Sequence, residues 1–288
     1  MKTAAAARPF TGTDTMPDSL SKASGAELLA IRDLRMGYGS GPAAQVLGGI
    51  SFAAREGEFL SVVGPSGCGK TTLLLVLAGL LRPDHGTISF AGTPILNGTP
   101  DGIAIVFQDY SRSLFPWKTV LDNVLFGMRR QRGVNRSERN DNARELIAAV
   151  GLSGTENRYP WQLSGGMQQR VAIARGLASR SRLLLLDEPM AAVDAQTRAD
   201  VQDLLLSLAQ RFNQTCVLVT HDVDEAVYMA DRIVVLSTRP TQVVEEIATP
   251  LGRPRDQIET REQKLYLEIR HEVLSIIRNL RKKSGELK

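Results

Sequence analysis

The sequence predicts an α/β fold, in which a parallel-sheet core carries an antiparallel β subdomain and an inserted α-helical subdomain. Three observations lead to this prediction. Short apolar runs alternate with helical sequence, which favours a parallel sheet covered on both faces. A glycine-rich loop follows one of these runs and precedes a helix. Residues 109–180 contain fewer glycine and β-branched runs than the sequence before them, and they carry Arg, Asn, Glu, Ala and Leu at helical spacing.

Five short strands are predicted in the first half of the chain. Partly alternating apolar residues predict an antiparallel pair of strands at 28–34 and 46–52. Short apolar runs predict three further strands at 58–63, 87–90 and 103–107. The third strand leads into the glycine-rich loop. A helix is predicted after the loop, over 71–81, and Arg82-Pro83 ends it. The last strand leads directly to Gln108.

The second half begins with the helical subdomain, at about 109–180, in which Ala143, Ile147 and Val150 mark one helix. Three more core strands are predicted, each after helical sequence, at 183–186, 216–220 and 233–236. We therefore expect the β subdomain, the core and the helical insertion to form one domain over 27–250.

The two ends of the chain differ from this domain. Residues 1–26 are rich in Ala, Ser, Thr, Pro and Asp without periodicity, which predicts a disordered tail. Residues 251–288 are predicted to form a helical extension with one apolar stripe, made of Leu265, Ile269, Val273, Ile276, Ile277 and Leu280. The extension either docks on the domain or serves as a membrane-surface or regulatory helix, and the sequence leaves both interpretations open.

Composition argues against several classes of function. Of the 288 residues, 43% are apolar and 5% aromatic, and the net charge is +4. A nucleic-acid partner is not expected, because the basic residues are scattered and few aromatics accompany them. The longest apolar run, Leu73–Leu81, is far shorter than the roughly 20 residues of a membrane span, and no signal-peptide core follows Met1. Cys68 and Cys216 lack partners at metal-ligand spacing, which is typical of a reduced cytosolic protein.

The glycine-rich loop matches the pattern G-x-x-x-x-G-K-[ST] and predicts a nucleoside triphosphate site; the alternative is a chance glycine-rich turn. Glycines let backbone N–H groups turn inward, and the following helix directs its positive end at the phosphates. Lys70 adds a positive charge near the β and γ phosphates, and Thr71 offers a hydroxyl to Mg²⁺. The predicted phosphate-binding residues are Gly64, Pro65, Ser66, Gly67, Cys68, Gly69, Lys70, Thr71 and Thr72.

Two adjacent carboxylates, Asp187 and Glu188, follow a run of four leucines. Because adjacent strand residues point to opposite faces, we expect these acids to have different roles. Asp187 is the candidate Mg²⁺ ligand, directly or through a water molecule. Glu188 is the candidate base for the water that attacks the γ-phosphate. The alternative is that both acids merely start a turn before Pro189.

Ser164-Gly165-Gly166 precedes a helix predicted over 167–177. As a structural feature, this segment is an N-cap with permissive glycines. As a functional feature, it is a second anion site, with a side-chain hydroxyl directed at phosphate. Spacing alone does not choose between the two interpretations.

Over roughly 27–250 the chain resembles the ATP-binding-cassette (ABC) ATPases, and Leu163-Ser164-Gly165-Gly166-Met167-Gln168-Gln169-Arg170 is similar to that family's signature. All of the family's hallmark segments occur in order, a combination far more specific than any one of them. The resemblance implies a P-loop NTPase fold with a RecA-like core, ATP and Mg²⁺ as ligands, and ATP hydrolysis. It also implies a head-to-tail pair, in which ATP lies between the phosphate loop of one copy and the signature of a second copy.

The resemblance also implies roles for four single residues. Tyr38 is similar to the aromatic residue that stacks on adenine, and the alternative is an ordinary strand aromatic. Gln108 resembles the glutamine that contacts Mg²⁺ and water and senses the γ-phosphate. Asp194 matches the aspartate that links the two sites, and His221 matches the histidine that contacts the γ-phosphate. The candidate catalytic residues are therefore Lys70, Gln108, Glu188 and His221.

Two departures from the family pattern lie near these residues. Ala191-Ala192-Val193 precedes Asp194, where relatives often have Ser-Ala-Leu, and Trp161 stands where relatives often have His or Glu. Neither departure touches the groups that react, so we still expect hydrolysis.

The segment Leu114–Val124, which contains Pro116-Trp117, resembles cassettes that serve importers of nitrate, sulfonate, taurine and related small anions. A simple turn with a packing aromatic is the alternative. The resemblance implies a peripheral subunit at the cytoplasmic face of the cell membrane, which drives separate permease subunits and works indirectly with a periplasmic or extracellular solute-binding protein. It also implies a permease-docking surface at 109–125, for which Phe115 and Trp117 are the candidate lining residues.

Two other classes of function fit the sequence less well. A cassette ATPase of DNA repair or translation usually carries a long coiled-coil insertion or a second cassette, and neither is present. A P-loop kinase or GTPase would use the phosphate loop but has no need of the signature or of His221. A cassette of another importer or exporter branch remains an alternative within the family.

Overall fold

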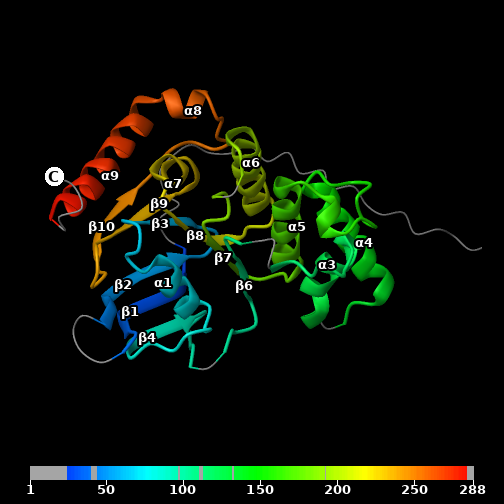
Figure 1. Ribbon diagram of the computed structural model, residues 1–288, viewed down its shortest axis with the longest axis horizontal. Helices are drawn as coiled ribbons and strands as arrows, with labels where there is room; N and C mark the ends of the chain where they lie inside the picture. The colour runs from blue at the N-terminus through cyan, green and yellow to red at the C-terminus, as the bar shows by residue number, and fades with distance from the viewer. Residues whose placement is uncertain are drawn as a thin grey trace, which may run out of the picture.

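The computed structural model describes residues 25–39, 44–96, 98–109, 113–131, 133–191 and 193–283. The predicted tail over 1–26 lies outside these residues, apart from its last two. Figure 1 shows two sheets on one side of the molecule and a group of helices, formed by residues 120–178, on the other. The prediction of an α/β fold is confirmed.

The core is a six-stranded sheet with the order β10-β9-β3-β8-β7-β6. Its strands are β3 (Phe59–Val63), β6 (Ile103–Val106), β7 (Leu183–Asp187), β8 (Thr215–Thr220), β9 (Arg232–Leu236) and β10 (Val243–Ala248). All neighbours pair in parallel except β10, which runs antiparallel to β9. Every residue of β3, β7 and β8 is buried, as expected for parallel strands that are covered on both faces.

A smaller antiparallel sheet lies beside the core. It consists of β1 (Glu27–Gly37), β2 (Gln45–Arg55), β4 (His85–Phe90) and β5 (Thr93–Pro94), in the order β2-β1-β4-β5. Helix α1 (Lys70–Leu77) packs with both sheets, since Leu73 and Leu74 share one apolar cluster with Ile50 of β2 and Val217 of β8. The helix that follows the phosphate loop is therefore held from two sides.

The first helix ends four residues earlier than the sequence predicts. Helix α1 stops at Leu77, and Gly79 adopts a left-handed φ of 70°. A Cβ at Gly79 would overlap the carbonyl oxygen of Gly98, so only glycine fits this close approach. The turn at Gly79, rather than Arg82-Pro83, ends the helix.

Between β6 and β7 the described residues form helices and turns. The helices are α3 (Val120–Gly127), α4 (Arg136–Ala149) and α5 (Gly165–Ala178), with short 3-10 turns at Met128–Arg130 and Pro160–Gln162. Side chains of Thr119, Asn135 and Ser164 cap the three helix N-termini. Ala143 and Ile147 face the core from α4, as the sequence predicts.

Two helices connect the core strands that follow. They are α6 (Ala195–Arg211) and α7 (Val223–Met229). The last described helices are α8 (Glu259–Glu262) and α9 (Lys264–Lys283), and α9 lies beside α7 at the edge of the molecule in Figure 1. Tyr266 and Arg270 of α9 both donate hydrogen bonds to the Asp224 carboxylate of α7. The C-terminal helix is thus attached to the helix that follows His221.

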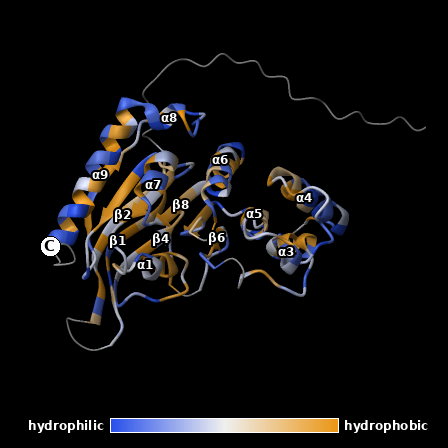
Figure 2. Cartoon of the chain, turned by 45° about the horizontal axis from the view of Figure 1, so that its top comes forward, coloured by the Kyte–Doolittle hydropathy of each residue, from blue (hydrophilic) through white to orange (hydrophobic). Residues whose placement is uncertain are grey.

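The buried stripe of α9 differs from the predicted one. Tyr266, Ile269, Val273 and Ile277 are buried, whereas Leu265 is 38% exposed. Figure 2 shows that α9 carries both hydrophilic and hydrophobic residues along its length. The prediction for Leu265 was wrong because Tyr266 continues the i, i+3, i+4 spacing of the stripe and Leu265 lies about 100° away from it. Within the described residues, no helix has the length and apolar character of a membrane span.

Candidate functional site

The predicted site residues gather where the parallel strands β3, β7 and β8 end. Val63 pairs with Thr220, and Asp187 pairs with Val219. The phosphate loop follows Val63, Glu188 follows Asp187, and His221 follows Thr220. Because carboxyl ends of parallel strands meet at one edge of the sheet, three segments far apart in sequence supply one site.

The phosphate loop is held closed by its own lysine. The Lys70 ammonium is buried and donates hydrogen bonds to the carbonyl oxygens of Gly64 and Pro65, at 2.9 and 3.0 Å. Gly67 and Gly69 have φ values of 73° and 112°, in the region that favours glycine. A Cβ at Gly69 would also overlap Val46 of β2. The loop therefore needs glycine for its backbone and for its contact with the neighbouring sheet.

Residues outside the predicted set support the loop. The hydroxyl of Thr241 donates a short hydrogen bond to the carbonyl oxygen of Cys68, and the Thr241 N–H donates to Val46 at 2.8 Å. The Cys68 side chain is buried, and burial raises the pKa of its thiol. This agrees with its interpretation as a small residue that the loop tolerates. Thr241 was missed because it lies 173 residues from Cys68 and matches no motif.

Thr71 and Asp187 form the candidate Mg²⁺ site. Thr71 Oγ1 donates a hydrogen bond to Asp187 Oδ1 at 3.3 Å. Burial raises the pKa of Asp187 to about 6; the nearby Glu188 charge also raises it, whereas the Thr71 hydrogen bond and Lys70 lower it. A hydroxyl and a carboxylate are the hard oxygen ligands that Mg²⁺ prefers, and Mg²⁺ takes its remaining ligands from phosphates and water. Within the described residues, no group of three or more His, Cys, Asp or Glu side chains is placed to hold a metal ion.

Glu188 and His221 form the candidate catalytic pair. Glu188 Oε2 lies 2.9 Å from His221 Nδ1, and the imidazole is about half exposed. Glu188 lies beyond the end of β7, with a φ of 41°, and its N–H donates to Val219 at 2.8 Å. The sequence prediction explained the different directions of Asp187 and Glu188 by strand alternation, and this explanation was wrong because Glu188 is not part of the strand. The left-handed backbone of Glu188 turns its side chain away from that of Asp187. Asp187 therefore contacts Thr71, and Glu188 contacts His221.

Gln108 and Tyr38 approach the site from two other segments. Gln108 follows β6, is exposed, and makes no hydrogen bond to the described side chains of the site. Tyr38 follows β1, and its exposed ring lies beside the loop because its hydroxyl is 3.3 Å from Thr72 Oγ1. An exposed ring in this position is open to stacking on a base.

The signature segment caps a helix. Ser164 Oγ accepts a hydrogen bond from the Met167 N–H at 3.3 Å and begins α5. Gly166 faces α6, where a Cβ would overlap Cγ2 of Thr197. Thr197 in turn donates from its N–H and its hydroxyl to Asp194, at 3.0 and 2.7 Å. These hydrogen bonds lower the pKa of the Asp194 carboxyl.

The structure thus divides the predicted residues into two groups. The phosphate loop, Asp187, Glu188 and His221 meet at the sheet edge. Ser164, Gly166 and Asp194 form a second group around the starts of α5 and α6. Within the described residues, no hydrogen bond joins Ser164 to the phosphate loop.

Two acidic residues behind the catalytic pair were not predicted. Asp222 caps α7 by accepting from the Glu225 N–H at 3.2 Å, and it pairs with Arg198 at 3.3 Å. Glu225 is buried, and Thr220 donates a short hydrogen bond to its carboxyl. No pattern marked Glu225, since an acid in the first turn of a helix is ordinary in a sequence.

The chain is similar to known proteins in sequence and in fold. The ABC transporter family matches residues 47–191. The taurine import ATP-binding protein TauB of Escherichia coli is 46% identical over 226 residues, which cover 78% of this chain and 86% of TauB. The nitrate import ATP-binding protein NrtC of Synechococcus elongatus is 43% identical over 235 residues, which cover 81% of this chain and 35% of NrtC. The solved dimer of the cassette MJ0796 bound to ADP and Pi is 32% identical, with a TM-score of 0.68, and the match covers 77% of this chain and 98% of that one.

Proposed function

Because the chain belongs to the ABC transporter family of transport-coupled ATPases, we propose that it is the energy-coupling subunit of an importer for a small anion such as nitrate, a sulfonate or taurine. The identity to TauB and NrtC, at 46% and 43%, supports this branch of the family. The Leu114–Val124 segment supports it from the sequence.

One observation carries the proposal for catalysis: the Glu188–His221 pair and the Thr71–Asp187 pair lie at the same sheet edge as the phosphate loop. Phosphoryl transfer to water needs positioning and charge stabilisation more than covalent chemistry. The Glu188 carboxylate can accept a proton from the attacking water, and the Lys70 ammonium nearby can stabilise the charge of the phosphates.

Each residue of the sheet edge has a separate task. Lys70, which now binds the loop carbonyl oxygens of Gly64 and Pro65, turns its ammonium to the β and γ phosphates of the substrate ATP. Thr71 and Asp187 hold Mg²⁺, which supplies charge neutralisation of the phosphates when it is bound. Glu188 orients the attacking water and accepts its proton, and His221 donates a hydrogen bond to the γ-phosphate.

The second group of residues completes the site of another copy. Ser164 begins α5, whose N-terminus can bind an anion together with the hydroxyl. Since Ser164 does not reach the phosphate loop of its own chain, ATP held between two copies brings the groups together. The MJ0796 cassette, solved as a dimer with ADP and Pi, supports a homodimer, and we propose that the two copies pair head to tail.

The permease partner binds beside Gln108. Trp117 is 72% exposed, and its ring is tilted by 46° against that of Phe115, at 5.5 Å between ring centroids. Phe115 packs edge-to-face on Phe126 at 4.6 Å. An exposed aromatic residue that packs on other aromatic side chains is a typical anchor for a partner helix. We place the subunit at the cytoplasmic face of the membrane, with permease subunits and a solute-binding protein supplying contact with the solute.

The variant Glu188→Gln tests the catalytic part of this proposal. It should bind ATP with nearly unchanged affinity, lose turnover by at least about 100-fold and form a stable dimer with ATP and Mg²⁺, measured by light scattering after gel filtration. A monomer that hydrolyses ATP at the wild-type rate would contradict the assignment of Glu188.

The variant Phe115→Ala/Trp117→Ala tests the docking surface. It should bind ATP normally but fail to co-purify from detergent with the permease subunits. Loss of ATP binding in this variant, or unchanged co-purification, would show that the aromatic cluster has another role.

A further inference from the structure

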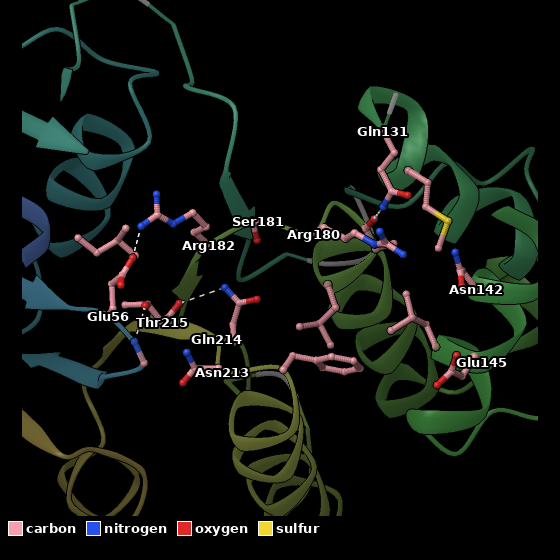
Figure 3. Close-up of a pocket in the computed structure, with 17 residues that line it drawn as sticks. Glu56, Gln131, Asn142, Glu145, Arg180, Ser181, Arg182, Asn213, Gln214 and Thr215 are labelled. Carbon is pink, nitrogen blue, oxygen red and sulfur yellow. Dashed lines mark hydrogen bonds and ion pairs between the residues drawn. The ribbon is translucent and has the colours of Figure 1, made fainter. Parts of the chain in front are cut away.

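A cavity of about 500 Å³ lies between the core sheet and the helices α4 and α5 (Figure 3). One side is formed by Arg182, Gln214 and neighbouring residues of the sheet, and the other by residues of α4 and of the turn after α3. A cavity of this size, lined by apolar groups and a few polar ones, suits a small organic molecule.

The cavity is separate from the nucleotide site. Its wall includes Ser181 and Arg182, which precede β7, and Thr215, which begins β8. The candidate catalytic residues follow the opposite ends of these strands, and Glu188 lies six residues beyond Arg182, about 20 Å along an extended strand. A ligand in the cavity and ATP would therefore occupy opposite edges of the same sheet.

Two buried polar atoms in the cavity wall have no hydrogen-bond partner among the described residues. They are Ser181 Oγ and Gln131 Oε1. Ser181 is only 6% exposed. Gln131 Nε2 donates to the carbonyl oxygen of Ala178 at 2.6 Å, which fixes the side chain and leaves its oxygen free to accept. Buried polar groups in folded proteins normally find a partner, so both atoms are available to a ligand.

The charges of the wall leave one cation without a partner. Arg182 pairs with Glu56, and Glu145 pairs with Arg211 at 2.7 Å. Arg180 also lines the cavity and makes no ion pair or hydrogen bond with a described residue. The wall carries two acids and two arginines, and Arg180 is the one of these four with no ion pair to a described residue, which favours a ligand with one negative charge.

Apolar side chains fill the rest of the wall. Leu28 comes from the antiparallel sheet, Met128 and Leu146 come from the helical segment, and Phe212 comes from the end of α6. Phe212 is partly exposed, so its ring can cover a bound apolar group.

We propose that this cavity binds a small organic monoanion, a carboxylate or sulfonate that carries an apolar body. Arg180 pairs with the anionic group, Ser181 and Gln131 hydrogen-bond to polar atoms of the ligand, and Met128 and Phe212 contact its apolar part. Such a ligand touches the core sheet and the helical segment at the same time. The site is independent of ATP hydrolysis, and its test measures binding rather than turnover.

The probe is 8-anilinonaphthalene-1-sulfonate, which carries one sulfonate on an aromatic body and fluoresces when buried. Titration of the full chain should show one saturable site. Arg180→Gln should weaken binding about fivefold or more, because it removes the charge-assisted contact. Asn142→Trp, which places an indole in the cavity from α4, should abolish the saturable signal. Arg278→Gln, which removes an exposed arginine of α9, is the matched control and should bind the probe like the wild type.

Three results would overturn the proposal. Displacement of the probe by saturating ADP with Mg²⁺ would place it at the nucleotide site. Equal affinity of Arg180→Gln and Arg278→Gln for the probe would show that Arg180 does not contact the anionic group. Unchanged saturable binding by Asn142→Trp, with a thermal unfolding midpoint like that of the wild type, would place the probe outside the cavity.

Discussion

The imidazole of His221 contacts the carboxylate of Glu188, with Nδ1 and Oε2 2.9 Å apart. The two residues lie 33 positions apart and meet because β7 and β8 are neighbouring parallel strands that end at one edge. The backbone of Glu188 is also attached to β8, through its hydrogen bond to Val219. A nucleotide that draws His221 to its γ-phosphate therefore changes the hydrogen bonding of the candidate base.

His221→Ala should lower the kcat of ATP hydrolysis by about 100-fold, because the γ-phosphate loses a hydrogen-bond donor and Glu188 loses its partner. The KM for ATP should change little, since the phosphate loop supplies most of the binding. His271→Ala, which removes an exposed histidine of α9, should leave kcat unchanged. Equal kcat values for the two variants would show that His221 has no part in turnover.

Gly166→Ala should impair ATP-dependent dimer formation, because a Cβ at this position overlaps Cγ2 of Thr197 and displaces the start of α5 from α6. Thr197→Ser removes that methyl group and keeps the hydroxyl that donates to Asp194. The double variant should therefore recover most of the lost dimer, measured by light scattering with ATP in a Glu188→Gln background. Failure of Thr197→Ser to restore any dimer would show that the overlap does not explain the defect.

Glu225→Gln should change how stability depends on pH. Burial raises the pKa of Glu225 to about 7, with nearby Asp222 and Glu188 adding to the rise and the Thr220 hydrogen bond opposing it. The unfolded chain releases this proton near its ordinary pKa, so between these pKa values the folded chain binds more protons. Stability from this group is present at low pH and falls as pH rises towards 7.

The free energy of unfolding of the wild type should therefore fall from pH 5 to pH 8 by about 3 kcal/mol more than that of Glu225→Gln, measured by urea unfolding. Glu272→Gln, on the exposed face of α9, should follow the wild type. Parallel stability profiles for the wild type and Glu225→Gln would contradict the raised pKa.

Val273→Ala should destabilise the protein by about 2 kcal/mol, because its smaller side chain leaves a gap at a buried position of α9 in the apolar core. Its neighbour Leu274 is partly exposed, and Leu274→Ala should cost less than about 0.5 kcal/mol. Urea unfolding of both variants compares the two faces of α9 directly. A larger loss of stability for Leu274→Ala than for Val273→Ala would show that the other face of α9 is the buried one.

The phosphate loop could be predicted from the sequence because its determinants are contiguous. Glycines that adopt positive φ, a lysine that reaches back to Gly64 and a strand-to-helix context all lie within about ten residues. The core strands were also predictable, since buried parallel strands appear as short, continuous apolar runs. These features depend on local chemistry, which the sequence displays.

Features that depend on distant partners could not be predicted. Thr241 supports the phosphate loop from a segment with no motif, and Thr220 holds the carboxyl of Glu225 only after β8 and α7 are placed. The left-handed backbone of Glu188 also has no sequence signal, because glutamate rarely adopts positive φ. On α9, the hydrogen bonds from the Tyr266 hydroxyl to Asp224 likewise form only after α7 and α9 are packed together.

We propose that ATP is bound between the phosphate loop of one copy and Ser164 of another. A crystal structure of Glu188→Gln with ATP and Mg²⁺ tests it most directly. We predict a two-fold dimer in which the Ser164 hydroxyl of one copy lies within hydrogen-bond distance of the γ-phosphate bound to the loop of the other. A nucleotide-bound monomer, or a dimer in which Ser164 faces away from the γ-phosphate, would contradict the account.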